Sequence, residues 1–220
     1  MMREIEDFNP VVHVFKESHK KYLDKFETGN NYPEKGLGDY IKNDALDDKA
    51  SGDGVSYIVL QQNKDGEIVD AIAFYTLVSS VIPCIYNFKT DEDGAYDTLF
   101  EIPAVRIQMF ALNQKYQDSL YEKELIASRV FKSIITQIDE MASEVMGIKA
   151  IYLYTIPSAK KFYKKNNFLE AERYMVKLAS GDEDCDLMYA FIREVHITYE
   201  ATDSKETILK RIWKNFRKNK

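Results

Sequence analysis

The sequence contains few of the residues that staple small secreted proteins or hold metals. Its 220 residues include two cysteines, three histidines and nine glycines. Cys84 and Cys185 stand far apart and predict free thiols rather than a disulfide framework, and the histidines show no metal-ligand spacing. No apolar run approaches the ~20 residues that span a bilayer, and the polar, acidic N-terminus is unlike a secretory signal. We therefore expect a cytoplasmic protein without a metal or a transmembrane segment.

What the sequence does contain is enough apolar surface for a packed core, with 45% hydrophobic and 13% aromatic residues. The net charge is −6, yet residues 205–220 hold seven Lys or Arg and one Glu, so that the remainder carries −12. This acidic body argues against nucleic acid as a partner. The basic segment predicts an amphipathic helix that packs on its own domain, on a second subunit as a homodimer, or on an anionic membrane or RNA. Its apolar face would hold Ile208, Leu209, Ile212, Trp213 and Phe216.

Patterns of apolar residues predict an alternation of strands and helices along the first half of the chain. We expect residues 1–10 to be loose. Strands are predicted at 11–16, 55–60 and 68–78, and helices at 17–26 and 37–50. Residues 87–101 follow as an acidic insertion, which is either a solvated loop or a loop that binds a basic amine or peptide acceptor.

The second half of the chain predicts a strand–helix–strand–helix unit with a parallel pair at its centre. Residues 102–112 alternate as a strand does, and residues 121–146 repeat apolar positions at helical spacing. Gly147 is expected to end that helix. Residues 148–156 are nearly all apolar, which is typical of a strand buried on both faces. A short helix over 158–168 and two further strands, at 169–179 and 186–192, complete the order.

The short helix carries a motif. Ala159 to Phe168 reads AKKFYKKNNF and resembles the A-x-x-F-Y-x-x-x-G-F signature of the GNAT superfamily of acetyl-CoA-dependent N-acetyltransferases. With the element order, the resemblance covers residues 11–192 and leaves 193–220 as an extension. It implies the α/β (α+β) GNAT acyltransferase fold: a mixed, mostly antiparallel sheet with one splayed parallel pair, and helices on both faces.

The resemblance also implies a place for acetyl-CoA, between the strands that end at Leu112 and Ile156. The pyrophosphate would lie at the start of the helix over 121–146, where free N–H groups attract anions. A backbone N–H near Leu112 would stabilise the oxyanion. The implied cofactor-binding residues are Phe110, Ala111, Leu112, Gln117, Asp118, Ser119, Lys123, Ala159 and Phe162.

Two residues are predicted to transfer protons during the reaction, one as an acid and one as a base. The resemblance assigns Tyr163 as the acid that protonates the leaving thiolate, although it could also be one more inward aromatic. Glu101 is our candidate for the base that deprotonates the amine, ahead of Asp97. Arg106 and Gln108 either face the acceptor or pair locally with an acid.

The sequence departs from the family pattern at the phosphate loop, which contains no glycine between Gln114 and Lys123. Losing one charge-assisted hydrogen bond there predicts roughly tenfold weaker CoA binding. Ile156 stands where the family often has Asn. Asn167 replaces a glycine and tolerates the left-handed conformation.

These observations predict an N-acetyltransferase that acts on a small-molecule or peptide amine. Two alternatives remain open: a catalytically inactive GNAT-fold binding protein, suggested by the glycine-free loop, and a toxin-like aminoacyl-tRNA acetyltransferase, suggested by the basic C-terminal segment.

Overall fold

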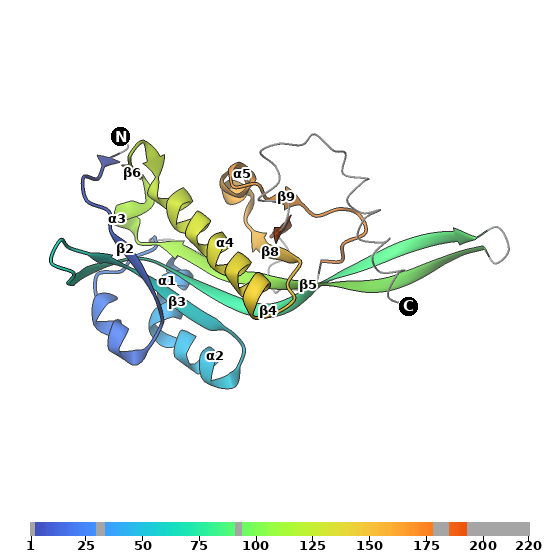
Figure 1. Cartoon of the computed structure of the whole chain (residues 1–220), viewed down its shortest axis with the longest axis horizontal. Helices are drawn as coiled ribbons and strands as arrows, with labels where there is room; N and C mark the ends of the chain where they lie inside the picture. Colours follow the sequence, from blue (N-terminus) through green and yellow to red (C-terminus); the bar gives the residue numbers. More distant parts are fainter. Residues whose placement is uncertain (1–2, 30–33, 91–93, 178–184, 193–220) are drawn as a thin grey trace.

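A computed structural model describes residues 3–29, 34–90, 94–177 and 185–192 (Figure 1). The helix predicted within 193–220, and with it the predicted dimer contact, lies outside these residues. The helical elements are η1 (Glu17–Tyr22), α1 (Glu34–Asn43), α2 (Ala45–Ser51), α3 (Gln114–Gln117), α4 (Ile126–Glu144), η2 (Pro157–Ala159) and α5 (Lys160–Lys165). The strands are β1 (Arg3–Glu4), β2 (Pro10–Val14), β3 (Val55–Gln62), β4 (Ile68–Thr90), β5 (Gly94–Leu112), β6 (Ser119–Tyr121), β7 (Glu124–Leu125), β8 (Ala150–Thr155), β9 (Leu169–Glu170) and β10 (Asp186–Phe191).

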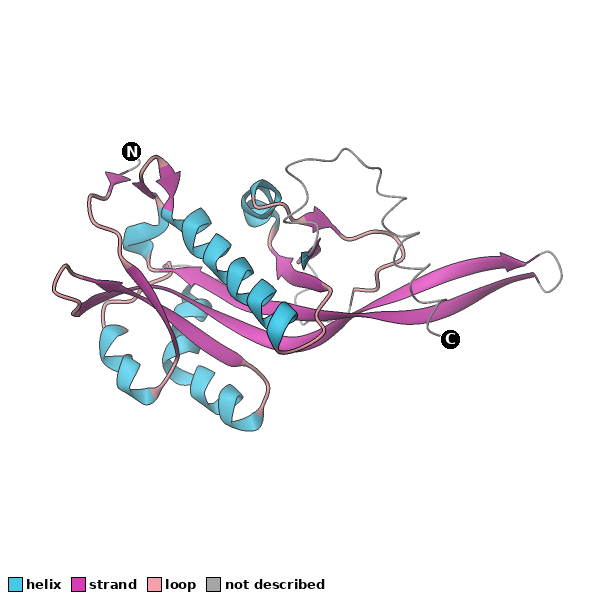
Figure 2. Cartoon of the chain, viewed as in Figure 1, coloured by secondary structure: helices cyan, strands magenta, loops and turns pink. Residues whose placement is uncertain are grey.

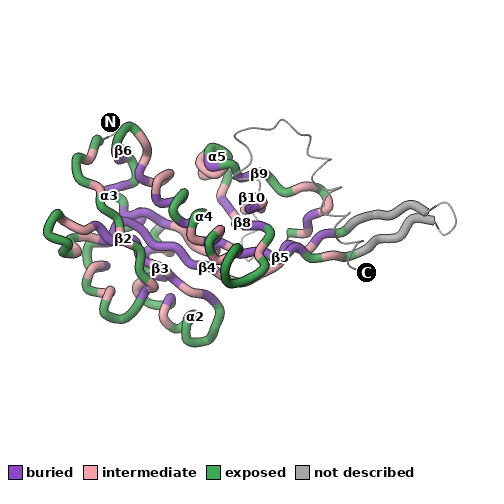
Figure 3. The backbone as a smooth tube through the Cα atoms, viewed as in Figure 1, coloured by how far each residue is buried: buried purple, intermediate pink, exposed green. Residues whose placement is uncertain are grey.

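The main sheet has seven strands in the order β2-β3-β4-β5-β8-β10-β9. β5 and β8 run parallel, whereas every other neighbouring pair is antiparallel. The predicted mixed sheet with one central parallel pair is therefore confirmed. Runs of buried residues lie in β3, β4 and β8, in the part of the sheet beside α4 (Figure 3).

Helices cover both faces of the sheet (Figure 2). α4 lies on one face because a stripe of apolar residues at four-residue spacing, all but inaccessible to solvent, points into the sheet. Burying each of these Ile or Val side chains contributes about 1.5–3 kcal/mol. The stripe consists of Ile126, Val130, Ile134 and Ile138. α1 and α2 cover the other face, where Ile41 and Ala45 pack with Phe26 and Phe74. Among the described residues, no helix is long and apolar enough to cross a membrane.

β4 and β5 continue far beyond the rest of the sheet as a two-stranded arm (Figure 1). Their pairing runs without a break from Leu77↔Ile107 to Thr90↔Gly94. The sequence analysis predicted a loop over 87–101, and this is wrong. At the base of the arm, Ile82 and Cys84 are buried while the neighbouring Ile85 is 44% exposed. Because both faces carry apolar residues, the period-2 signal of a strand is lost there.

The segment before α4 also differs from the prediction. The helix expected over 121–146 begins at Ile126, because residues 119–125 form the β6–β7 hairpin. β6 pairs in parallel with β1, so residues 3 and 4 are part of a small second sheet. Of the strand expected over 169–179, the described residues 169–177 form only β9 and one bridge, Cys84↔Met175.

Candidate functional site

The central feature is the point where β5 and β8 part. Their register covers three pairs and ends at Arg106↔Tyr152. β5 then continues to Leu112 and β8 to Thr155 with no further pairing between them. β5 carries a bulge here, because Leu77 faces Ile107 and Thr76 faces Met109, which leaves Gln108 without a partner. A bulge bends its strand, so the predicted splay is present and has a local cause.

An aromatic cluster lies beside this gap, on the side of α4. Phe110 of β5 and Phe162 of α5 stack with their ring centroids 6.1 Å apart. Phe131 of α4 packs against Phe162 and Tyr163 at 5.4 Å each. These rings connect the three elements that border the gap, and a thin ligand lying along β5 would pack against them.

Tyr163 belongs to this cluster and is half-buried. Its apolar surroundings raise the pKa of the phenol above its usual value. The hydroxyl makes no hydrogen bond within the described part of the chain. At neutral pH Tyr163 therefore holds its proton, as a proton donor must. Asn167, three residues after Lys164, has φ 66°, so the prediction that it takes the left-handed conformation of the family's glycine is confirmed.

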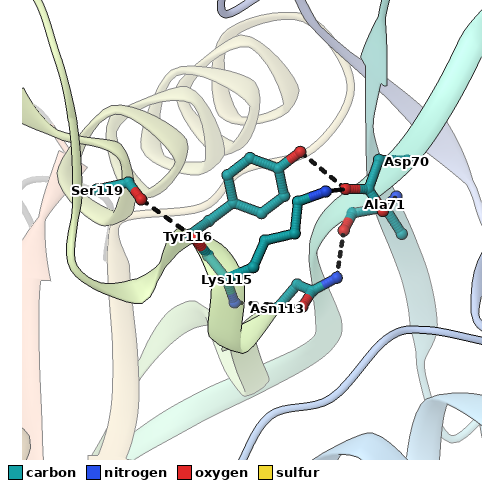
Figure 4. Close-up of polar contacts among 6 residues, drawn as sticks. All are labelled: Asp70, Ala71, Asn113, Lys115, Tyr116 and Ser119. Atoms are coloured by element: carbon teal, nitrogen blue, oxygen red, sulfur yellow. Dashed lines mark hydrogen bonds and ion pairs between the residues drawn. The ribbon is translucent and has the colours of Figure 1, made fainter. Parts of the chain in front are cut away.

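The chain that leaves β5 is held by polar contacts around α3 (Figure 4). Asp70 accepts a hydrogen bond from the Tyr116 hydroxyl at 2.9 Å and pairs with Lys115. Asn113 Nδ2 donates to the carbonyl of Ala71 at 3.0 Å. These contacts tie the turn after β5 to the start of β4 and fix its course.

Two predicted cofactor-binding side chains are used inside this turn. Gln117 Nε2 donates to the carbonyls of Thr28 and Leu112, at 2.8 and 3.2 Å. Ser119 is buried, and its hydroxyl donates to the carbonyl of Lys115 at 3.2 Å. Asp118 is exposed beside them. The structure thus gives Gln117 and Ser119 a role in shaping the turn.

The β6–β7 hairpin leads directly into α4. Its tip residues Glu122 and Lys123 have φ of 49° and 66°, the left-handed conformation that glycine adopts most readily. Leu125 is the N-cap of α4 and has no side-chain cap hydrogen bond. The first N–H groups of α4 are therefore not satisfied by a capping side chain, as an anion site requires.

Charged residues that the sequence analysis missed surround this hairpin. Arg129 Nη2 lies 2.8 Å from Glu122 Oε2, and Arg129 Nε lies 3.3 Å from Glu124 Oε2. Lys132 Nζ lies 2.6 Å from the other oxygen of Glu124. The paired residues are five, seven and eight positions apart, and the hairpin brings them together. A helix-spacing rule could not have found these pairs.

The remaining predicted residues are divided between the gap and the arm. Ala111 and Leu112 are buried at the end of β5, and Ala159 lies in η2 just after β8. Arg106 lies where β5 and β8 part. Glu101 is exposed at the base of the arm, opposite Pro83. It is roughly 17 Å along the strand from Arg106, and Asp97 lies further along the arm, so neither residue lies at the gap.

A separate pocket of about 330 Å³ opens beside α1. It is close to the turn after β5, because the Gln114 N–H donates to the Glu27 carbonyl at 2.6 Å. Gly38 fits under Thr28, whose hydroxyl accepts from the Gly38 N–H at 3.1 Å. The pocket is lined by Phe26, Glu27, Thr28, Gly29, Lys35, Gly38, Asp39 and Lys42.

The sequence matches no family model and no curated protein. The structure, however, is similar to solved structures of other proteins. The AtaT toxin, as a tyrosine-to-phenylalanine mutant, matches with a TM-score of 0.63 at 12% identity over 89% of this chain and 98% of that one. The corresponding kind of mutant of KacT matches with a TM-score of 0.60 at 13% identity over 86% of this chain and 98% of that one. The chain has the GNAT acyltransferase fold.

One expectation about partners is overturned by these neighbours. The sequence analysis argued against nucleic acid and for a small-molecule or peptide amine. AtaT in complex with acetyl-methionyl-tRNA matches with a TM-score of 0.58 at 13% identity over 87% of this chain and all of that one. Another neighbour is AtaT with AtaR bound to DNA. These two neighbours are complexes that contain nucleic acid, and none of the neighbours supports a small-molecule acceptor.

Proposed function

We propose that the chain is an acetyl-CoA-dependent N-acetyltransferase whose acceptor is the α-amine of an aminoacyl-tRNA. The observation that carries this proposal is the parting of β5 and β8 after Arg106↔Tyr152, beside a half-buried tyrosine. Neighbours of the same fold include AtaT bound to acetyl-CoA and AtaT with acetyl-methionyl-tRNA.

The gap fits acetyl-CoA in two respects. From Phe110 to Leu112, the side of β5 that faces β8 is paired with none of the described strands, so an extended pantetheine arm could add there as a strand would. The uncapped start of α4 suits the pyrophosphate. Acetyl-CoA would supply the activated acyl group.

The acceptor follows from what is missing near the gap. Within the described chain, no residue of β5 beyond Arg106 or of β8 is a carboxylate that could serve as a base. At pH 7.4, deprotonating a lysine-like amine of pKa ~10.4 costs about 4 kcal/mol, whereas an α-amine of pKa ~8 needs about 0.8 kcal/mol. The nearest carboxylate, Asp186 opposite Thr155, is engaged by Lys160 at 2.8 Å. The α-amine of an aminoacyl ester is an acceptor that such a site could use without a strong base.

α5 adds positive charge at the end of β8. Lys161 and Lys165 are exposed and form no ion pair within the described residues, unlike Lys160 and Lys164, which pair with Glu170. They are four residues apart on one helical face. Exposed, unpaired lysines of this kind attract a phosphate backbone.

The chain's own residues divide the chemistry between them. The backbone N–H near Leu112 would hold the carbonyl oxygen as it gains negative charge. Tyr163 would give its proton to the leaving sulfur, since its raised pKa keeps it protonated. The aromatic ring of Phe131, which packs against Tyr163, would help to keep water away from the reacting atoms.

Calorimetry and transfer assays test the proposal together. The wild type should bind acetyl-CoA saturably and transfer label from acetyl-CoA to aminoacyl-tRNA. Tyr163→Phe should keep acetyl-CoA affinity and lower turnover by about 10²–10⁴-fold, whereas Tyr22→Phe, outside the gap, should change neither. No binding at millimolar acetyl-CoA would overturn the proposal and favour the inactive binding protein instead.

A further inference from the structure

The face of the sheet opposite α4 carries two separate apolar clusters. Met109 and Ala111 of β5 belong with the cluster under α1 and α2. Ile102 and Ala104, earlier on the same strand, belong with the cluster at the base of the arm. Because alternate strand residues share a face, Arg106 lies on this face directly after Ala104 and before the bulge. A cation therefore occupies the interval between the two clusters.

The surroundings of Arg106 hold it in place without neutralising it. Its guanidinium carbon lies 5.0 Å from the centre of the Tyr154 ring, which favours a cation over an aromatic face. The neighbouring Tyr152 hydroxyl lies 2.6 Å from Ser80 Oγ, so these two hydroxyls satisfy one another. Arg106 Nε is buried and has no hydrogen-bond partner among the described residues, and no described carboxylate forms an ion pair with Arg106.

An arginine with a buried, unpaired nitrogen is an incomplete arrangement. Leaving a buried donor unsatisfied is unfavourable, and native proteins rarely do so without a reason. A guanidinium offers five donors in one plane, in a fork that matches two oxygens of a phosphate. The Tyr154 ring already positions the guanidinium of Arg106. Arg106 is therefore preorganised to bind an oxyanion from another molecule.

The position of Arg106 indicates which oxyanion this is. Arg106 and Tyr152 form the last pair before the strands part, where the acyl group and the amine would meet. In an aminoacyl-tRNA the carboxyl group is esterified and neutral, so the nearest negative charges are the phosphates of the 3′-terminal nucleotides. The phosphates of acetyl-CoA are expected at the other end of the gap, at α4.

We propose that Arg106 binds a phosphate of the single-stranded 3′ end of the acceptor RNA and so positions the α-amine at the gap. This inference rests on the proposed function for its substrate. Beyond that function, the inference identifies a residue that recognises RNA, and it explains why an arginine stands at this position of β5. Gln108, the unpaired bulge residue two positions on, is within the same stretch of strand.

Direct RNA binding tests the inference without requiring turnover. The probe is a fluorescent RNA minihelix ending in single-stranded CCA, titrated by anisotropy at 50 to 200 mM salt. Arg106→Gln should weaken binding about tenfold, the loss of one charge-assisted contact. It should also reduce the slope of log affinity against log salt by about 0.7–0.9, as the loss of one phosphate contact does. Arg106→Lys, which keeps the charge and loses the fork, should fall between wild type and Arg106→Gln.

Two controls make the result specific. Arg173→Gln removes an exposed arginine outside the gap and should leave both the affinity and the salt slope close to wild type. Acetyl-CoA affinity by calorimetry should be unchanged in Arg106→Gln, which also shows that the variant is folded. A tenfold loss of acetyl-CoA affinity would instead place Arg106 on the phosphates of CoA and overturn the inference.

The outcomes separate this inference from the proposed function. RNA binding that depends on Arg106, in a wild type that transfers no acetyl group to aminoacyl-tRNA, supports the inference and contradicts the proposed function. If the protein transfers acetyl groups to aminoacyl-tRNA and Arg106→Gln leaves the KM unchanged, the proposed function is supported and the inference is contradicted. Absence of minihelix binding by the wild type, or equal binding by Arg106→Gln, overturns the inference.

Discussion

Arg129 Nη2 lies 2.8 Å from Glu122 Oε2 beside the start of α4, and its Nε lies within ion-pair distance of Glu124, at 3.3 Å. Two carboxylates thus lie beside the helix end at which the proposed function places a pyrophosphate. Arg129 and Lys132 neutralise them, so the positive charge available there is already in use.

Removing one of these carboxylates should therefore tighten acetyl-CoA binding. A charge about 6 Å from a phosphate in a water-like environment is worth roughly 0.7 kcal/mol, so Glu122→Gln and Glu124→Gln should each lower Kd by about threefold at low salt. Calorimetry measures this, and 0.5 M NaCl should erase most of the gain. Glu140→Gln, exposed near the other end of α4, is the matched control. An unchanged or higher Kd in Glu124→Gln would mean that the phosphates bind elsewhere.

Between pH 6 and 10, kcat/KM for acetyl transfer should change with pH in one direction only. kcat/KM should rise with pH through about 8, as the α-amine of the acceptor loses its proton. It should then stay level up to about pH 10, because burial raises the pKa of Tyr163 and keeps its proton in place. Initial rates between pH 6 and 10 give the profile. A decline between pH 8.5 and 10 would contradict the assignment of Tyr163 as the acid.

Buried tyrosines should make the fold less stable in alkali. Burial raises the pKa of Tyr75, with a smaller effect of Tyr57, and burial and then Asp70 raise that of Tyr116. In the unfolded chain both phenols ionise near 10. Above that pH the folded state binds more protons than the unfolded state, so the free energy of unfolding falls, by about 1.4 kcal/mol per pH unit for each tyrosine.

Urea unfolding at pH 8, 10 and 11 measures this slope. Tyr116→Phe removes one ionisable group, and its slope above pH 10 should be shallower than that of the wild type by about 1.4 kcal/mol per pH unit. At pH 8 the same variant should lose about 1 kcal/mol, through the hydrogen bond to Asp70. Parallel slopes for variant and wild type would show that Tyr116 ionises as readily in the folded protein.

Phe131 should be the most sensitive core position near the gap. It is inaccessible to solvent and contacts Phe110, Phe162, Tyr163 and Phe168. Phe131→Ala should lower the free energy of unfolding by about 3–5 kcal/mol, and Phe131→Leu by roughly 1–1.5 kcal/mol. Denaturant midpoints report both. Val145→Ala, 73% exposed just after the same helix, should cost less than about 0.5 kcal/mol. Equal losses for Phe131→Ala and Val145→Ala would refute the packing described.

The sequence predicted the central unit well because its local signals agree with the tertiary structure. The apolar run that contains Ile151 and Leu153 forms a buried strand beside β5. The four-residue spacing from Ile126 to Ile138 lies against the sheet as expected. The motif from Ala159 to Phe168 contains the helix α5, which is shorter than predicted and follows a buried strand as the resemblance implied.

Other features were hidden for identifiable reasons. The arm was missed because its base buries Cys84 and exposes Ile85, which removes any alternation of apolar and polar residues. The hairpin before α4 was missed because Glu122 and Lys123 adopt left-handed backbone conformations without a glycine to signal them. Gln117 and Ser119 have side chains suited to a phosphate, yet the fold uses them on its own carbonyls. Such choices depend on neighbours distant in the chain, and no local pattern records them.

The three-residue ladder between β5 and β8 divides the sheet into two blocks, β2 to β5 on one side and β8, β10 and β9 on the other. Backbone hydrogen bonds from Lys149 to Pro103 and from Val176 to Pro83 also join the blocks, at the base of the arm. Because all these connections lie at or before the level of Arg106 along β5, a thermal fluctuation should separate the strand ends beyond Arg106 more readily than the rest of the sheet. The separation of these two strand ends would then set how bulky a ligand the molecule admits.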